Sequence, residues 1–181
     1  MDQTDNDVPL ERRSVFPDRN TTEKLNTSEL LMLWTIRAWV QDTHGTPTRR
    51  YKLQDVLERA GCGDAIDSLC TLLEIVGAAG KRRIEIHATG CLCISTDEKR
   101  MLHTLAAQQS GHTLEAFDVL THLIPGAAAR IALGHAESVA ASMTRVGLLL
   151  PDRAWCLAEL SLTHRLRAPR AASTCVRYEL H

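Results

Sequence analysis

Residues 83–95, with the sequence RIEIHATGCLCIS, are the one stretch of this chain in which apolar and polar side chains alternate at the period of a β-strand. Elsewhere the apolar residues recur mostly at spacings of three and four, which is the pattern of an α-helix. A short alternating segment with a turn residue in its middle predicts a β-hairpin. We therefore expect a mainly helical protein with one small β-hairpin.

The composition favours helices over a β-sandwich. Apolar residues make up 44% of the 181 residues but aromatic residues only 4%, and alanine and leucine supply most of the apolar side chains. Such side chains favour closely packed helices, whereas strands prefer β-branched and aromatic residues. The length is sufficient for a buried core in one domain or two small ones.

Glycines, prolines and capping residues divide the chain into six or seven predicted helices. Ser95 followed by Glu98 forms a capping box, which predicts a helix start. The first helix is apolar on most of its surface, which predicts that it lies in the interior. The predicted starts are Thr27, Tyr51, Asp64, Ser95, Thr113, Pro125 and Asp152, with Asp64, Thr113 and Asp152 acting as caps and the last helix ending near Leu166.

Three predicted helices followed by a hairpin, across residues 27–95, resemble a winged-helix module in element order. The resemblance implies a role in binding DNA or another protein. We expect residues 1–26 to form a flexible arm, residues 96–166 a helical bundle packed on the first unit, and residues 167–181 a tail.

The charge balance gives no preference for nucleic acid or an anionic membrane, because 21 basic and 22 acidic residues leave a net charge of −1. The N-terminus lacks the basic start and apolar run of a secretory signal, and no window approaches the ~20 apolar residues of a membrane span. We expect a cytoplasmic protein without a membrane partner. Its six cysteines are then expected to be reduced thiols.

The predicted hairpin contains three soft ligands, His87, Cys91 and Cys93. Residues two apart on a strand share a face, and a turn at residues 88–90 would bring His87 near the two thiols. Zinc is the metal that this set would bind, although zinc sites usually have four ligands. Packing of a half-buried hairpin predicts the same residues.

Six basic residues precede the second predicted helix and the hairpin, where they could contact phosphates. The third predicted helix, which Asp64 caps, carries Asp67 and Glu74, and no basic residue lies between Gly61 and Gly80, so it would repel a DNA backbone. Solvated loop charges explain the same pattern. The six residues are Arg49, Arg50, Lys52, Lys81, Arg82 and Arg83.

The sixth predicted helix is rich in small residues, which allow another backbone to approach closely. This helix is either the packed centre of a bundle or an interaction surface, including a contact between two copies of the chain. The residues of that candidate surface are Ala128, Ala132, His135, Ala136 and Val139.

Catalysis is not expected, because the sequence holds no phosphate-binding loop and no local catalytic signature. Glu115, Asp118 and His122 share one helical face, which reads as a solvated face. The function predicted from the sequence is therefore a non-enzymatic protein-interaction or regulatory module, whose partner is another protein or a second copy. The alternatives are a DNA-binding regulator of winged-helix type and a metal or redox sensor, with zinc as the only cofactor considered.

Overall fold

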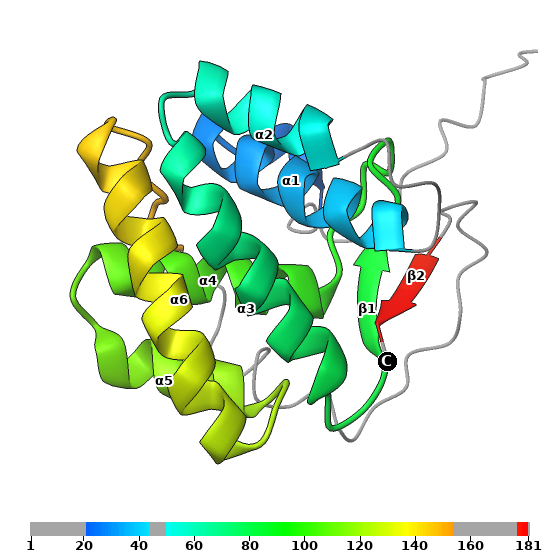
Figure 1. The fold of residues 1–181 in the computed structure, drawn as a ribbon. Coiled ribbons are helices and arrows are strands. Elements are labelled where there is room, and N and C mark those ends of the chain that lie inside the picture. The colour runs from blue at the N-terminus through cyan, green and yellow to red at the C-terminus, as the bar shows by residue number, and fades with distance from the viewer. Residues whose placement is uncertain (1–20, 44–49, 154–176, 181) are drawn as a thin grey trace, which may run out of the picture.

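Helices dominate the computed structural model, which describes residues 21–43, 50–153 and 177–180 (Figure 1). Those residues form six α-helices and two short strands: α1 Thr27–Thr43, α2 Arg50–Arg59, α3 Ile66–Ala78, β1 Ile84–His87, α4 Thr96–Gln109, α5 Thr113–Thr121, α6 Gly126–Arg145 and β2 Arg177–Leu180. The predicted mainly helical class is confirmed. No helix in the described ranges is both long and apolar enough to cross a membrane.

α4 runs through the interior, with α1, α5, α6 and β1 packed around it. Figure 1 shows it behind α3 and α6. All its residues from Asp97 to Ala107 are buried, although its first turn is charged. The predicted capping box is present, because Ser95 Oγ accepts from the N–H of Glu98 and the Glu98 carboxylate accepts from the N–H of Ser95. A charged turn in the interior requires a partner for each charge.

α3 and α6 pack side by side through small residues of α6. The buried positions on this face recur at alternating spacings of three and four, so they form one stripe, and alanine lets the two helix axes approach closely. The stripe joins a single cluster of buried apolar residues that includes positions on both sides of Ser95. Its members are Ala129, Ala132, Ala136, Val139 and Met143.

The predicted β-hairpin over residues 83–95 is wrong. Its first half forms β1, but β1 pairs antiparallel with β2, with Ile84 opposite Leu180. The loop after β1 is irregular, and Cys93 forms an isolated bridge with the segment before α1. Alternation identifies a half-buried extended segment but not its pairing partner. Here the side chain of Arg37 binds the carbonyls of Cys91 and Cys93 in that loop.

The winged-helix resemblance is not confirmed, because its wing is that hairpin. The order α1, α2, α3, β1 does follow the prediction. The helical-bundle description and the domain ranges stay predictions. The seventh predicted helix after Asp152 falls almost entirely outside the described residues, as do residues 1–20 of the arm. Within the predicted tail, Arg177–Leu180 forms β2.

Two predicted helix caps are wrong. Asp64 lies in a 3₁₀ turn before α3, and its carboxylate accepts from Ser142 and Arg145 of α6 instead of capping the helix. Thr113 is the first residue of α5, and the N-cap His112 makes no side-chain hydrogen bond there. Ser142 and Arg145, which are distant in sequence, donate to the Asp64 oxygen that would otherwise accept from a backbone N–H at the start of α3.

Candidate functional site

The carboxylate of Glu98 is the centre of a buried charge cluster at the start of α4. The side chains of Arg37 and Glu98 are 2% and 0% exposed. Oε1 accepts from Arg37 Nε at 2.7 Å and from the N–H of His87 at 2.9 Å. Oε2 accepts from Arg37 Nη2 at 3.0 Å and from the N–H of Ser95 at 2.8 Å. Each oxygen has two donors, which is the condition under which a buried ion pair is tolerated.

Arg37, the one basic residue of α1, also holds the loop that follows β1. Its Nη1 donates to the carbonyl of Cys91 at 2.6 Å and its Nη2 to the carbonyl of Cys93 at 2.6 Å. The planar guanidinium can make these bonds and the bidentate pair with Glu98 at the same time. Leu92, between the two bonded carbonyls, is thereby fixed beside α1.

His87 lies buried between two acceptors. Its Nδ1 is 3.0 Å from the carbonyl oxygen of Cys93, and its Nε2 is 3.3 Å from Glu85 Oε1. Burial by itself lowers the pKa of His87, but hydrogen bonds to Glu85 and to the Cys93 carbonyl, with the charge of Glu98, outweigh burial and raise that pKa above its ordinary value. The protonated ring is the form that satisfies both neighbours.

Asp97 is the centre of a second charge cluster. Arg82 donates to its two oxygens at 2.7 and 2.5 Å, Arg100 Nη1 donates at 2.7 Å, and the N–H of Glu85 donates at 3.0 Å. Burial raises the pKa of Asp97, yet the bonds from Arg82 and Glu85 and the charge of Arg100 outweigh burial, so that pKa is lowered. The ionised carboxylate ties the loop after α3 to α4.

The buried polar side chains of the described ranges are hydrogen-bonded, except for Gln108 Nε2. Glu29, His103 and Arg153 border one cavity, in which Glu29 pairs with Arg153. His103 Nε2 lies 2.8 Å from Glu115, which the sequence had placed on a solvated face. This cavity, and an apolar one between α3 and α4, each have room for about one water molecule.

The predicted metal ligands do not form a ligand set. Both ring nitrogens of His87 face other acceptors, Cys91 is disulfide-bonded, and Cys93 is not in a disulfide. The expectation that all cysteines are reduced is therefore wrong for Cys91. Within residues 21–43, 50–153 and 177–180, no three His, Cys, Asp or Glu side chains are placed to hold a metal ion. Metal or redox sensing stays a prediction that the geometry does not support.

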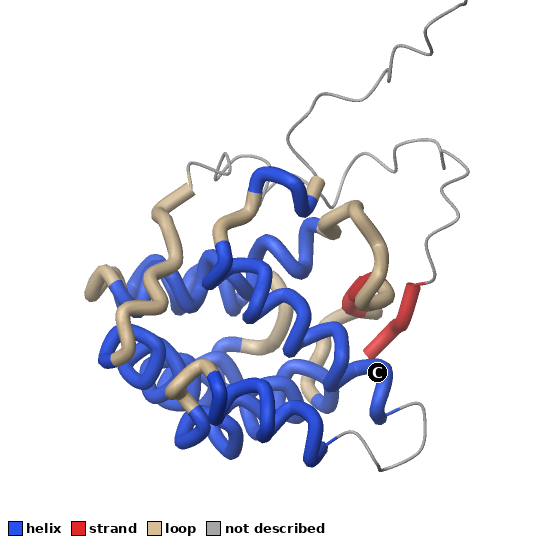
Figure 2. Tube along the Cα trace, turned by 90° about the horizontal axis from the view of Figure 1, so that it is seen from above, coloured by secondary structure: helices blue, strands red, loops and turns tan. Residues whose placement is uncertain are grey.

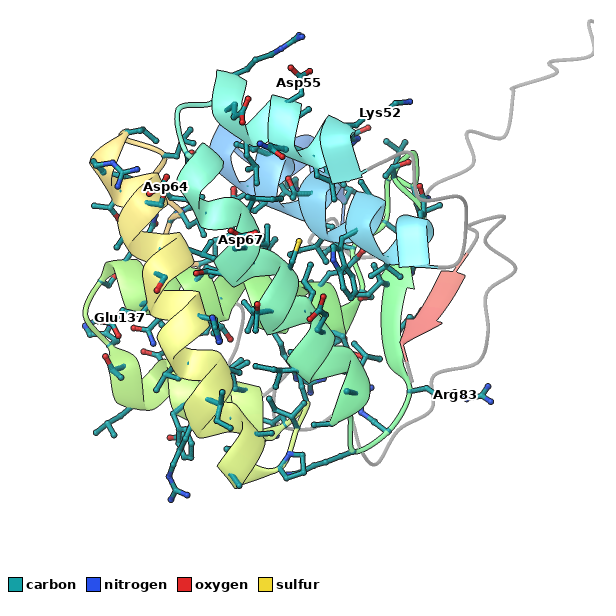
Figure 3. All side chains as sticks on the ribbon, in the orientation of Figure 1. Lys52, Asp55, Asp64, Asp67, Arg83 and Glu137 are labelled. Carbon is teal, nitrogen blue, oxygen red and sulfur yellow. The ribbon has the colours of Figure 1, made fainter. Side chains whose placement is uncertain are left out.

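The predicted nucleic-acid contacts, as far as they are described, do not form a single cluster. Lys52 on α2 and Arg83 before β1 lie at separate ends of the molecule (Figure 3). Lys81 donates to a carbonyl at the end of α5 at 2.6 Å, and Arg82 is engaged with Asp97. The remaining two are Arg50, the first residue of α2, and Arg49, which is outside the described residues.

The predicted interaction surface on α6 faces the core. Ala132, Ala136 and Val139 are 0% exposed, whereas Ala128 and His135 are half-buried. Because α3, α4 and α5 pack against α6, the small side chains admit the chain's own helices. Ala132, Ala136 and Val139 therefore lie in a packed centre, one of the two roles that the sequence leaves open.

Three large apolar side chains on and beside α1 are exposed: Leu30 by 41%, Trp34 by 36% and Leu92 by 60%. Leu30 and Trp34 are one turn apart and within roughly 60° of Arg37 around the helix. Arg37 binds the carbonyls on both sides of Leu92. We call these three exposed residues the α1 patch. The sequence predicts that the whole of α1 lies in the interior, so these exposed positions were not expected.

Comparisons with protein-family models, with curated proteins and with solved structures found no match to this chain. No family is assigned. The geometry of the two charge clusters and of the α1 patch is then the basis for a functional proposal.

Proposed function

We propose that this chain is a non-enzymatic protein-interaction module and that the α1 patch binds a partner protein. The proposal is carried by the exposure of Leu30 and Trp34, one turn apart on α1, and of Leu92 in the loop that Arg37 holds against α1. Exposed apolar side chains grouped in this way are typical of interaction sites, and tryptophan is among the residues most enriched at binding hot spots.

The α1 patch rests on a rigid base, which supports a binding role. Arg37 joins α1 to the loop that carries Leu92, and Glu98 joins both to the buried α4. A surface that is already ordered loses less conformational entropy when a partner binds. The buried charges therefore have a structural reason to be present without a catalytic one.

The charge clusters support a structural role better than a catalytic one. Both oxygens of Glu98 and of Asp97 already accept hydrogen bonds from the chain itself. The two cavities described above are far smaller than the roughly 300–1,000 Å³ of a typical small-molecule site. The nucleic-acid alternative is weaker too, because Lys81 and Arg82 are engaged within the protein.

The test is affinity capture from lysate of the native host with nuclease present, comparing wild type with the double variant Trp34→Gln, Leu92→Gln. Leu114→Gln is the matched control, because Leu114 is 82% exposed but lies on α5. We expect a partner protein to bind wild type and the control alike, and to bind the double variant about 30-fold more weakly, as loss of a hot spot implies. Sedimentation of the purified proteins shows whether that partner is a second copy.

Equal capture by wild type and the double variant would contradict binding at the α1 patch. A strictly monomeric protein that retains no partner would contradict the interaction role itself. Material that disappears with nuclease would instead support the nucleic-acid alternative.

A further inference from the structure

The backbone of β1 has two edges, and side chains from the start of α4 cover one of them. The N–H of Glu85 donates to Asp97 Oδ2 at 3.0 Å, and the N–H of His87 donates to Glu98 Oε1 at 2.9 Å. The carbonyl of Glu85 accepts from Ser95 Oγ at 2.5 Å. These side chains form hydrogen bonds with the backbone groups that a third strand would otherwise bind.

The opposite edge of β1 carries β2. Successive residues of a strand direct their N–H and C=O groups to alternate edges, so Ile84 and Ile86 direct theirs to β2. In the register, Ile84 stands opposite Leu180 and Ile86 opposite Tyr178. Figures 1 and 2 show β2 beside β1 at the rim of the helices. This outer edge depends on a strand for its hydrogen bonds.

β2 is a weak occupant of that edge for two reasons. Both strands are four residues long, and an isolated two-stranded ribbon is marginally stable. Like charges also stand directly opposite each other, Glu179 against Glu85 and Arg177 against the readily protonated His87. Directly opposed like charges destabilise a pair of strands.

We propose that the outer edge of β1 is a strand-binding site for an extended segment of another protein, which replaces β2. The segment pairs antiparallel with β1 and, like β2, carries apolar residues opposite Ile84 and Ile86, which are both 0% exposed. It has an acidic residue opposite His87 and a basic residue opposite Glu85. From N- to C-terminus the partner therefore reads acidic, apolar, basic, apolar. Main-chain hydrogen bonds provide binding, and the alternate side chains provide specificity.

The test uses two full-length variants and two labelled hexapeptides. Tyr178→Pro removes an amide that faces β1, whereas the matched control Glu179→Pro removes one that faces away. One peptide, Val-Arg-Tyr-Glu-Leu-His, is the chain's own residues 176–181; the other, Val-Glu-Tyr-Lys-Leu-His, has the two charges inverted. Binding is measured by fluorescence anisotropy and by amide chemical shifts of β1.

We expect the charge-inverted peptide to bind Tyr178→Pro at least about tenfold more tightly than wild type or Glu179→Pro, since in these β2 competes at a high effective concentration. It should also bind Tyr178→Pro roughly twofold to thirtyfold more tightly than the native peptide, the range for two cross-strand charge pairs. The amide resonances of Ile84 and Ile86 should shift on binding.

The proposal is overturned if a folded Tyr178→Pro protein binds neither peptide, or if the charge order makes no difference. A second variant does not require β2 to be released: Glu179→Lys should slow hydrogen exchange at Ile84 and Ile86 severalfold, and unchanged exchange would contradict the like-charge argument.

The inference rests on the proposed function only in that the ligand is a protein. Peptide binding that persists in the Trp34→Gln, Leu92→Gln variant separates failure of the α1 patch from failure of the strand site.

Discussion

Removal of Arg37 would leave the Glu98 carboxylate buried without its counter-charge. We expect Arg37→Leu to lower the free energy of unfolding by about 3–5 kcal/mol, because the remaining charge is desolvated and unpaired. Combining it with Glu98→Gln removes that charge, so the double variant should be more stable than Arg37→Leu alone. Urea unfolding followed by circular dichroism measures all three proteins.

The control for this experiment is Arg59→Leu, since Arg59 pairs with Asp55 on the surface of α2. An exposed pair contributes about 0–1 kcal/mol, so this variant should unfold almost as wild type does. Equal losses for Arg37→Leu and Arg59→Leu would show that the buried pair has no special role.

The pH dependence of stability should show the contribution of His87 to the free energy of unfolding. Because its pKa is raised in the folded state, the protonated ring stabilises the fold fully below the ordinary pKa of about 6.5, and this contribution is lost as the pH rises through the higher folded value. The difference in unfolding free energy between wild type and His87→Gln should thus shrink as the pH rises above about 6.5. Denaturant unfolding at several pH values measures it.

His122 provides a control of opposite sign. Burial and the charges of Arg100 and Lys81 lower the pKa of His122, so protonation of that ring opposes folding. The contribution of His122 relative to His122→Gln should then grow, not shrink, as the pH rises. The same trend in both variants would argue against the assignment for His87.

At the residue scale, the sequence predicted what depends on near neighbours. Ser95 and Glu98 are three residues apart, and their capping box is present as predicted. The further partner of Glu98 is Arg37, 61 residues away, which no local pattern identifies. His87 was recognised as a candidate metal ligand, whereas the neighbours of its ring in the fold, the Glu85 carboxylate and the Cys93 carbonyl, were not predicted.

At the scale of elements, the α3–α6 contact depends on small side chains. Ala136 is 0% exposed on the face of α6 that packs in the core, so Ala136→Leu should lower the free energy of unfolding by about 1–3 kcal/mol through overpacking. Ala141 is exposed on the same helix, and Ala141→Leu should stay within about 0.5 kcal/mol of wild type. Thermal or urea unfolding decides, and equal effects would contradict the packing assignment.

Helix positions were predictable where breakers and caps are local, as at Thr27 for α1 and Pro125 before α6. β1 was predictable as an extended segment, but its pairing with β2 was not. The alternation over residues 83–95 reports that one side of the segment is buried, and it contains no information about a strand almost a hundred residues further along the chain.

For the whole molecule, the interior position of α4 predicts which region opens last. Its amides from Met101 to Ala106 should exchange hydrogen most slowly, because they become accessible only when the surrounding helices separate. Amides of α2, which has exposed residues such as Lys52 and Gln54, should exchange through local opening. Native-state hydrogen exchange at low denaturant measures both, and equally fast exchange in α4 would contradict its central position.

The sequence by itself determined that the protein is mainly helical, where most helices begin, the capping box of α4 and the extended character of β1. Each of these depends on propensity, periodicity and hydrogen bonds between residues a few positions apart. Only the tertiary structure decided that β1 pairs with β2, that Arg37 binds Glu98 and the loop of Leu92, and that α6 faces inward while part of α1 is exposed. These outcomes depend on contacts between residues far apart in the chain, which are selected by the packing of the whole core.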